Sequence, residues 1–114
     1  MSETIFDKII SRDIPAEIIY EDNNYLAFND INPQAPIHIL IIPKKRIPTI
    51  NDIQQNDSDL IGGLFLTAKN IAIQKGIHQD GYRLVLNCNE NGGQTVYHIH
   101  LHLIGGRKLS WPPG

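Results

Sequence analysis

The apolar residues of this chain recur with two different spacings, and each spacing predicts a different kind of element. A spacing of three to four residues predicts helices, whereas alternation with period two, or a short apolar run bounded by turn residues, predicts strands. Five strands are expected, at residues 17–21, 25–29, 37–42, 82–88 and 96–104. The first two are joined over the turn-forming residues 22–24 and should form a hairpin.

Two helices are also predicted. The first is short, because it starts after Ser2 or Thr4 as N-cap and is limited by Pro15. Its apolar positions at helical spacing are Ile5, Phe6, Ile9 and Ile10. The second helix covers residues 57–75 and ends at Gly76. Its apolar stripe consists of Leu60, Ile61, Leu64, Phe65, Ala68, Ile71 and Ala72.

The order of these elements predicts an α+β domain with an antiparallel sheet. Gly62 and Gly63 lie inside the long helix and cost about 1 kcal/mol each relative to alanine, so they indicate a close backbone approach, with another chain as one candidate. The length of 114 residues favours a single domain over residues 1–114. A dimer would bury additional surface.

Composition narrows the class of partner. The formal net charge is −2, and the ten Lys and Arg residues are scattered apart from residues 44–46 and 107–108, so we expect no polymeric nucleic-acid partner. We expect neither a membrane span nor a signal peptide. Cys88 is the only cysteine, which excludes an intrachain disulfide and favours a reducing, cytoplasmic location, with the nucleus as an additional compartment.

The run VYHIHLHLIGG at residues 96–106 has a histidine at every second position. On a strand, His98, His100 and His102 would project from one face and the intervening apolar residues from the other. A single such histidine is ordinarily a hydrogen-bonded core or surface residue without chemistry. Three buried rings on one face would each need a partner, which favours a functional interpretation.

Two chemistries suit this row. Neutral imidazole is a common zinc ligand, but strand rise separates the Cα atoms of His98 and His102 by roughly 13 Å, so a zinc ion would need His38 as well. In nucleophilic catalysis, one neutral ring attacks an electrophile. Charges on adjacent rings repel by on the order of 2.5 kcal/mol at an effective dielectric near 20, which helps to keep such a ring neutral near pH 7.

The segment GGQT at residues 92–95 leads directly into the histidines. Its backbone N–H groups, the Gln94 amide and the Thr95 hydroxyl could hold the anionic oxygens of a phosphoryl group without a metal. A hairpin loop is the ordinary interpretation, with Asn91, Gly92 and Gly93 suited to positive φ.

The residues from His98 to Ile104 resemble the signature of the histidine triad (HIT) superfamily, His-φ-His-φ-His-φ-φ with φ apolar. Four further segments are similar to its HINT branch, the histidine triad nucleotide-binding proteins: DINPQAPIHILIIPKK at residues 30–45, the strand that ends near Asn87, GGQTVYHIHLHLIGGR, and the terminal WPPG. This resemblance implies the HIT-like fold, a five-stranded antiparallel sheet with one long and one short helix, continued across a homodimer.

The same resemblance implies a purine nucleoside phosphoramidase. Such an enzyme hydrolyses AMP-amine conjugates through a covalent nucleotidyl-histidine, needs no cofactor or metal, and binds AMP or GMP and their phosphoramidates. Carried over by position, the nucleophile is His100 and the phosphate contact is His102. His98 and His38 would orient the triad, and Thr95 would bind phosphate or assist the leaving group.

The resemblance also assigns the nucleotide contacts. Asp30 would accept hydrogen bonds from the ribose hydroxyls, and Gln94 would bind phosphate oxygens or assist the leaving group. The apolar purine pocket would consist of Ile5, Phe6, Ile9, Phe28 and Ile31. The other predicted contacts are Asn87, Gly93 and Leu101. Trp111 would reach toward the partner subunit's site and influence the choice of amine.

The chain departs from the family pattern at three positions. Thr95 stands where many members carry Ser, Arg46 where His is common, and Ser110 where His often precedes the Trp. Two other functions remain open from the sequence. One is a nucleotide-binding or scaffolding dimer with vestigial hydrolysis, and the weaker one is a zinc-binding module built from His38 and two triad members.

Overall fold

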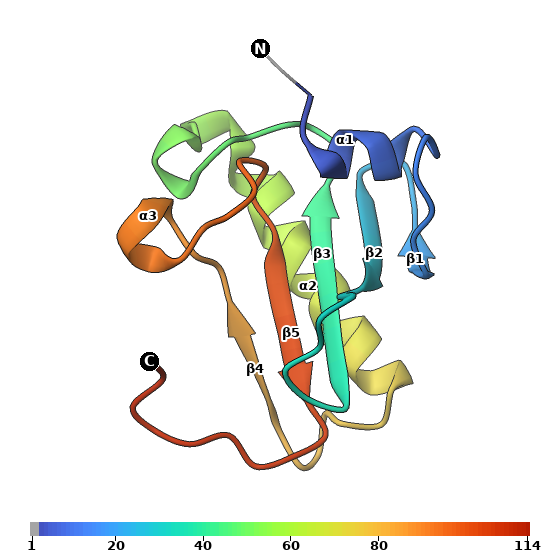
Figure 1. Cartoon of the computed structure of the whole chain (residues 1–114), viewed down its shortest axis with the longest axis vertical. Coiled ribbons are helices and arrows are strands. Elements are labelled where there is room, and N and C mark those ends of the chain that lie inside the picture. The colour runs from blue at the N-terminus through green and yellow to red at the C-terminus, as the bar shows by residue number, and fades with distance from the viewer. Residues whose placement is uncertain (1–2) are drawn as a thin grey trace.

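An antiparallel sheet of five strands, in the order β1-β2-β3-β5-β4, forms the centre of the molecule (Figure 1). The computed structural model describes residues 3–114. Its strands are β1 (Ile18–Glu21), β2 (Tyr25–Asn29), β3 (Ile37–Pro43), β4 (Tyr82–Val85) and β5 (Leu101–Gly105). Its helices are α1 (Ile5–Ile10), α2 (Ser58–Gln74) and α3 (Asn89–Gly92), with 3-10 turns η1 (Ile50–Asp52) and η2 (Gln55–Asp57). The predicted α+β class, first hairpin and five-stranded antiparallel sheet are confirmed.

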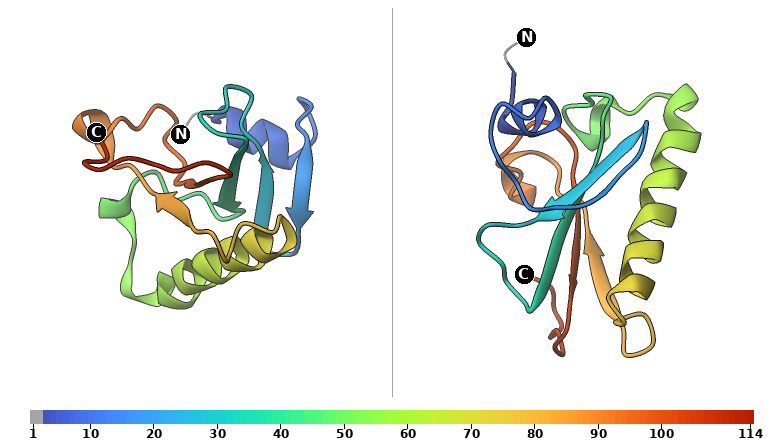
Figure 2. Two further views of the ribbon diagram at one scale, coloured as in Figure 1. Left: turned by 90° about the horizontal axis from the view of Figure 1, so that it is seen from below. Right: turned by 90° about the vertical axis from the view of Figure 1, so that its right-hand side faces the viewer.

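The two faces of the sheet pack against different elements (Figure 2). α2 lies along one face, where alternate residues of β3 and β5 form a core with it: Ile39, Ile41, Leu101 and Leu103. α1 lies at the other face, near Leu40 and Ile42 of β3. Because side chains alternate along a strand, the same strands supply a closed core on one side and a cavity floor on the other.

α1 begins where the sequence predicts. Thr4 is its N-cap, and Thr4 Oγ1 accepts hydrogen bonds from the backbone N–H groups of Phe6 and Asp7. In return, Asp7 Oδ2 accepts from the backbone N–H of Thr4 at 2.8 Å. The alternative cap, Ser2, lies outside the described residues. This capping box fixes the start of the helix and leaves Phe6 and Ile9 buried against the sheet.

α2 differs from the prediction at two points. Phe65 is 43% exposed, because the buried positions follow a stripe that starts at Leu64, and Phe65 is one residue off it. A Cβ at Gly63 would collide with the Tyr25 hydroxyl, which donates to the Leu60 carbonyl at 2.6 Å, so the close approach comes from this chain. A Cβ at Gly62 would meet nothing within 4 Å. Within residues 3–114, no helix is long and apolar enough to cross a membrane.

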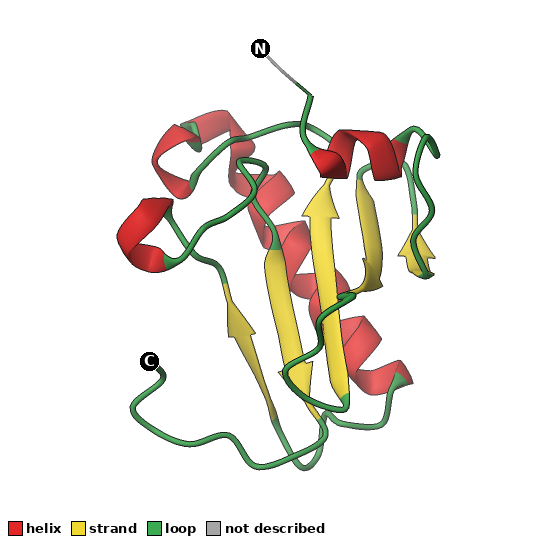
Figure 3. Cartoon of the chain, in the orientation of Figure 1, coloured by secondary structure: helices red, strands yellow, loops and turns green. Residues whose placement is uncertain are grey.

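The strands before and after α3 are shorter than predicted. β5 starts at Leu101 rather than residue 96, and β4 ends at Val85 rather than residue 88. The register that pairs Ile41 with Leu101 would next place Ile99 opposite Pro43, which has no N–H to donate. Ile99 N–H instead donates to Ile47 O at 2.8 Å, so a loop leads into β5 (Figure 3).

The connection between β4 and β5 is also different from the expected hairpin loop. Residues 89–92 form the short helix α3. Of the three residues expected at positive φ, only Gly93 has it, with φ 86°, where it ends this helix. Asn89 also has a positive φ of 59°, which the sequence did not indicate.

Candidate active site

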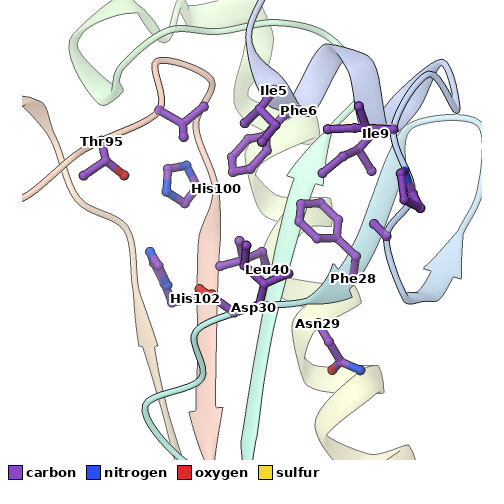
Figure 4. Close-up of a pocket in the computed structure, with 15 residues that line it drawn as sticks. Ile5, Phe6, Ile9, Phe28, Asn29, Asp30, Leu40, Thr95, His100 and His102 are labelled. Carbon is purple, nitrogen blue, oxygen red and sulfur yellow. The ribbon is translucent and has the colours of Figure 1, made fainter.

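A cavity of about 340 Å³ opens between α1 and the sheet (Figure 4). His100 and His102 lie at one end of it, and Phe28 and Ile9 lie toward the other. Nine of the predicted site residues line this cavity: Ile5, Phe6, Ile9, Phe28, Asp30, Ile31, Thr95, His100 and His102. The structure therefore gathers residues from α1, β2, β5 and the loop before β5 around one space.

The three histidines do not share one strand face, as the sequence predicted. Only His102 lies on β5, whereas His98 and His100 belong to the irregular segment before it. The ring of His98 is fully buried, 6.0 Å from the ring of Phe6 between centroids. The rings of His100 and His102 lie 5.1 Å apart. The loop thus brings two of the three rings together and turns the third beneath α1.

Hydrogen bonding determines which nitrogen of His100 carries the proton. Its Nδ1 lies 2.8 Å from the backbone carbonyl oxygen of His98. A carbonyl oxygen can only accept, so Nδ1 donates and the neutral ring keeps its lone pair on Nε2. The ring of Phe6 packs edge-on against His100 at 5.0 Å. Nε2 is therefore the nitrogen available for nucleophilic attack.

A second series of hydrogen bonds, through Gln34 and His38, orients His102. The backbone N–H of Gln34 donates to His38 Nδ1 at 3.0 Å, so neutral His38 carries its proton on Nε2. This Nε2 lies 2.9 Å from His102 Nδ1 and donates to it. The proton of neutral His102 is then on its own Nε2. His102 can therefore donate a hydrogen bond to a phosphate oxygen while His100 remains an electron-pair donor.

All four rings favour the neutral form near pH 7. Burial lowers the pKa of His38, His98 and His100 below the ordinary value of 6.5. Burial also lowers the pKa of His102 to about 4, and positive charge on His100 or His38 would act in the same direction. Asp30 opposes this effect at His102 without cancelling it. A nitrogen nucleophile reacts only when it is unprotonated, so the burial favours catalysis.

His98 connects the histidines to α1. Its Nε2 donates to Pro43 O at 2.7 Å, and its Nδ1 has no hydrogen-bond partner within residues 3–114. This Nδ1 faces Asp7 Oδ1 at 3.8 Å, and Asp7 forms an ion pair with Arg46 at 3.2 Å. His98 is not among the cavity-lining residues. Its contact with His100 is made by its backbone carbonyl, which accepts from His100 Nδ1, and the orienting role assigned to its ring stays a prediction.

The apolar end of the cavity suits a planar ring. Phe6 and Phe28 meet edge to face at 5.5 Å, and Ile31 lies at the rim with 97% of its surface exposed. Asp30 Oδ1 accepts from the N–H of Asn32 at 2.8 Å, which is the ordinary Asx-turn role of this residue type. Its carboxylate also lines the cavity, where a sugar hydroxyl could donate to it.

Gln94 has a structural role that the sequence did not indicate. Its Oε1 accepts from the N–H of Asn89 at 2.9 Å, and its Nε2 donates to Pro48 O at 2.6 Å and to Val96 O at 3.1 Å. The side chain is buried and does not line the cavity. Its amide holds the loop before β5, so a phosphate contact would require one of these bonds to break.

Four other predicted contacts also lie outside the cavity: Asn87, Gly93, Leu101 and Trp111. Leu101 points into the α2 core, because it is the neighbour of His102 on β5 and successive residues of a strand face opposite sides of the sheet. Trp111 is 79% exposed and lies against the guanidinium of Arg83 of this chain, 5.9 Å from its ring centroid.

Six further residues line the cavity that the sequence did not indicate: Ile14, Pro15, Ala16, Asn29, Leu40 and Val96. Strand alternation could have identified Leu40, since it pairs with Phe28 across β2 and β3 and shares its face. The amide of Asn29 donates to Glu17 Oε1 at 2.6 Å. No sequence pattern indicates residues 14–16 as cavity-lining residues, because the chain after α1 is irregular and approaches the cavity only through tertiary packing.

Among the residues that the structure describes, one group of side chains could hold a metal ion. Asp30, His38 and His102 place one ligand atom each within 4.8 Å of one another. The zinc interpretation expected His38 with two triad members, whereas the structure brings together one triad member and a carboxylate. The other two histidines each direct one nitrogen at a backbone carbonyl instead.

Comparisons with known proteins identify a matching family and close relatives of similar length. The HIT domain family matches residues 11–109. The purine nucleoside phosphoramidase of Escherichia coli K12 is 56% identical over 107 residues, which cover 94% of this chain and 90% of that protein. An uncharacterized HIT-like protein of Synechococcus elongatus is 56% identical over 115 residues and the full length of both chains.

Solved structures have the same fold. A HIT family hydrolase from Legionella pneumophila has a TM-score of 0.97 at 55% identity, covering 98% of this chain and 100% of that one. A histidine triad nucleotide-binding protein from Candida albicans has a TM-score of 0.83 at 28% identity, covering 96% of this chain and 83% of that one.

Proposed function

Because this chain belongs to the HIT domain family, we propose that it is a purine nucleoside phosphoramidase that hydrolyses AMP-amine conjugates through a nucleotide bound covalently to His100. The observation that carries the proposal is the neutral His100 ring, whose Nδ1 proton is held by the His98 carbonyl and whose Nε2 is left with its lone pair. This ring lies at the end of an apolar cavity of about 340 Å³. The phosphoramidase of Escherichia coli supports the same reaction class.

The reaction proceeds in two displacements. First, the Nε2 lone pair of His100 bonds to the α-phosphorus, the P–N bond to the amine breaks, and the amine nitrogen takes a proton from water. The imidazole becomes positively charged, and the His98 carbonyl stabilises that charge through the Nδ1–H. Second, a water oxygen bonds to phosphorus, the bond to His100 breaks, and the water proton passes to solvent. AMP is released and the ring is neutral again.

Neighbouring groups act on the charge that develops on the phosphoryl oxygens. His102 donates from Nε2, because its Nδ1 is occupied by the His38 N–H. Thr95 lines the cavity beside these rings and offers a hydroxyl to the phosphate or the amine. Its branched Cβ restricts χ1, so this hydroxyl is less mobile than a serine hydroxyl would be.

The cavity supports a purine nucleotide as the bound half of the substrate. Phe6, Phe28 and the neighbouring isoleucines form an apolar slot, and Asp30 offers a carboxylate for the ribose. AMP and GMP both satisfy these features.

Hydrolysis of adenosine 5′-monophosphoramidate tests the function. His100→Ala should lower kcat/KM by roughly a thousandfold or more, because no other group supplies the nucleophile. His78→Ala, at an exposed loop position, is the matched control and should change little. Chelator treatment of the wild-type protein should leave its rate unchanged. Unaltered turnover in His100→Ala would contradict the proposal, and a loss restored by zinc would favour the metal site at Asp30, His38 and His102.

We also propose that the chain forms a homodimer. β4 is an edge strand with all four residues only partly buried, so its outer side has free backbone groups for pairing. Phe65 and Leu66 of α2 are 43% and 58% exposed, which leaves apolar surface for a partner. Sedimentation should give twice the mass of one chain. A Val85→Asp variant should shift the protein to monomers, and a purely monomeric wild-type protein would contradict this proposal.

A further inference from the structure

Asp7 of α1 uses its two carboxylate oxygens for different partners. Its Oδ2 accepts from the backbone N–H of Thr4 at 2.8 Å and forms an ion pair with Arg46 Nη2 at 3.2 Å. Its Oδ1 faces His98 Nδ1 at 3.8 Å, which is too long for a hydrogen bond. The side chains of Asp7 and Arg46 are 19% and 20% exposed, so solvent screens their charges less than it screens charges on an open surface.

His98 can meet this carboxylate in two forms. As a neutral ring it donates from Nε2 to Pro43 O, and the lone pair of Nδ1 then faces Asp7. As a cation it also carries a proton on Nδ1, and that proton points toward Asp7. Within residues 3–114, this Nδ1 is the one buried side-chain nitrogen or oxygen without a hydrogen-bond partner. The charges around Asp7 therefore decide which form of His98 is populated.

The groups that face His98 act on its protonation in opposite directions. Burial is the largest influence and lowers the pKa of His98. The Pro43 carbonyl and the Asp7 carboxylate raise the pKa of His98, whereas positive charge on Arg46 or on His100 lowers this pKa. Arg46 thus opposes protonation of His98 twice, through its own charge and by neutralising the charge of Asp7.

The charge of His98 affects the reaction because His100 becomes a cation when it takes up the nucleotide. The carbonyl of His98 accepts from His100 Nδ1 at 2.8 Å, so the two residues are directly joined. Electrostatic coupling between two groups is reciprocal, so positive charge on His98 opposes positive charge on His100. A protonated His98 would therefore raise the barrier to the first displacement.

We propose that Arg46 is a positioning residue for the reaction, which pairs with Asp7, keeps His98 uncharged and so allows His100 to take up positive charge. The inference rests on the phosphoramidase function and adds a residue that does not line the nucleotide cavity. It also gives a role to the departure from the family pattern at residue 46, because the arginine has its partner, Asp7, in the same chain.

The pH profile of kcat/KM for adenosine 5′-monophosphoramidate tests this role. Arg46→Gln should move the midpoint of the acid limb upward by roughly one pH unit, because the pKa of His98 rises when the opposing charge is removed. Above about pH 8.5, where His98 is neutral in both proteins, the two rates should agree within about twofold. Arg46→Lys keeps the charge and should keep the wild-type midpoint.

Two further variants identify the groups involved. Adding Asp7→Asn to Arg46→Gln removes the carboxylate that attracts the proton, so the midpoint should return close to its wild-type value. Lys44→Gln removes a neighbouring positive charge that pairs with Glu21 at 2.8 Å and should leave the midpoint unchanged. NMR titration of the His98 ring should show the same shifts in each variant without any substrate.

A change in the height of the profile is distinguishable from a change in its midpoint. An unchanged midpoint in Arg46→Gln would overturn the inference, and so would rates that fall equally at every pH, which is what a purely structural role produces. A midpoint that stays shifted in the double variant would show that Asp7 does not mediate the effect and would also overturn it.

The NMR titration separates this inference from the function on which it rests. If the wild-type protein shows no turnover, the phosphoramidase function fails, whereas the titration of His98 still decides whether Arg46 controls its charge. If Arg46→Gln does not fold, Asp7→Asn alone provides the test, because it should lower the pKa of His98 below the wild-type value. A pKa of His98 that is unchanged in Asp7→Asn would overturn the inference.

Discussion

The two faces of the sheet are built from the same strands, but one packs into an apolar core and the other carries hydrogen-bonded polar side chains. On the α2 face, alternate residues such as Ile41 and Leu103 are fully buried in an apolar core. On the α1 face, the neighbouring positions hold His38 and His102, which are joined by a hydrogen bond of 2.9 Å beside an open cavity. One face serves stability, and the other holds polar groups in defined protonation states.

This difference shows where the reactive geometry originates. The α2 face follows from local periodicity, because every buried residue needs only to be apolar and of suitable size. The histidine face depends on specific backbone partners. Gln34 binds His38 from the neighbouring loop, whereas Pro43 binds His98 and Ile47 binds the segment that carries His100 from far away in sequence. A change on the α2 face should therefore alter stability and leave catalysis nearly intact, whereas a change on the histidine face should alter catalysis and the pH dependence of stability.

The largest expected effect is on the pH dependence of stability. Folded His102 has a pKa of about 4, whereas an unfolded histidine has one near 6.5, so the unfolded state binds more protons between these values. Stability is fully present above pH 6.5 and falls as the pH is lowered, by up to about 3 kcal/mol for His102 alone. The lowered pKa values of His38, His98 and His100 add to the same slope.

Urea unfolding between about pH 7.5 and pH 5 measures this slope. His102→Gln should flatten it, because glutamine does not titrate. His78→Gln, at an exposed position, should leave the slope as in the wild type. An identical slope in the wild type and in His102→Gln would contradict the assignment of a neutral, buried His102.

A smaller effect is expected on the α2 face. Gly63→Ala introduces a Cβ that collides with the Tyr25 hydroxyl and should lower the free energy of unfolding by about 2 kcal/mol. Gly62→Ala is the matched control, since its Cβ meets nothing within 4 Å and should raise stability by about 0.5–1 kcal/mol through helix propensity. Denaturant midpoints give both values. The kcat of folded Gly63→Ala should stay near wild type, and a large loss would mean that the faces are coupled.

The smallest expected effect concerns the hydrogen bond from His38 to His102. His38→Phe keeps an aromatic ring but removes the N–H that donates to His102 Nδ1, so His102 is no longer held as an Nε2 donor. We expect kcat to fall roughly tenfold, with KM for the nucleotide changing less. Steady-state kinetics at pH 7.5 checks this, and His38→Gln, which retains an N–H donor, should be less impaired. Equal rates for wild type and His38→Phe would show that the hydrogen bond from His38 to His102 does not contribute to catalysis.

The sequence predicted the parts of the fold that depend on local pattern. The Thr4 cap, the first hairpin and the course of α2 all follow from side-chain spacing and turn residues. The start of β5 could not be predicted this way, because it depends on Pro43 lying opposite Ile99 in the register. Phe65 was misplaced because a one-residue error in a helical stripe turns a side chain by about 100°.

The same distinction applies to the candidate site. The residue types of the histidine row indicated nucleophilic chemistry, and the resemblance to the family indicated His100 as the nucleophile. The tautomer of His100 depends on the irregular backbone that brings the His98 carbonyl to its Nδ1, and the tautomer of His102 depends on a tertiary hydrogen bond from His38; residue spacing reveals neither. Gln94 was assigned to the phosphate because a glycine-rich loop suggested it, whereas its amide bonds three backbone groups of its own loop and the segment around Pro48.

The proposed reaction requires Nε2 of His100 to form a covalent bond to phosphorus. Its most direct test is intact-mass analysis of a reaction with adenosine 5′-monophosphoramidate that is quenched within the first turnover, followed by mapping of the modified peptide. We expect a species heavier by one AMP group on the peptide that contains His100, present in the wild type and missing in His100→Ala. Continued turnover by the wild type with the nucleotide never found on this histidine, or found on another residue, would contradict it.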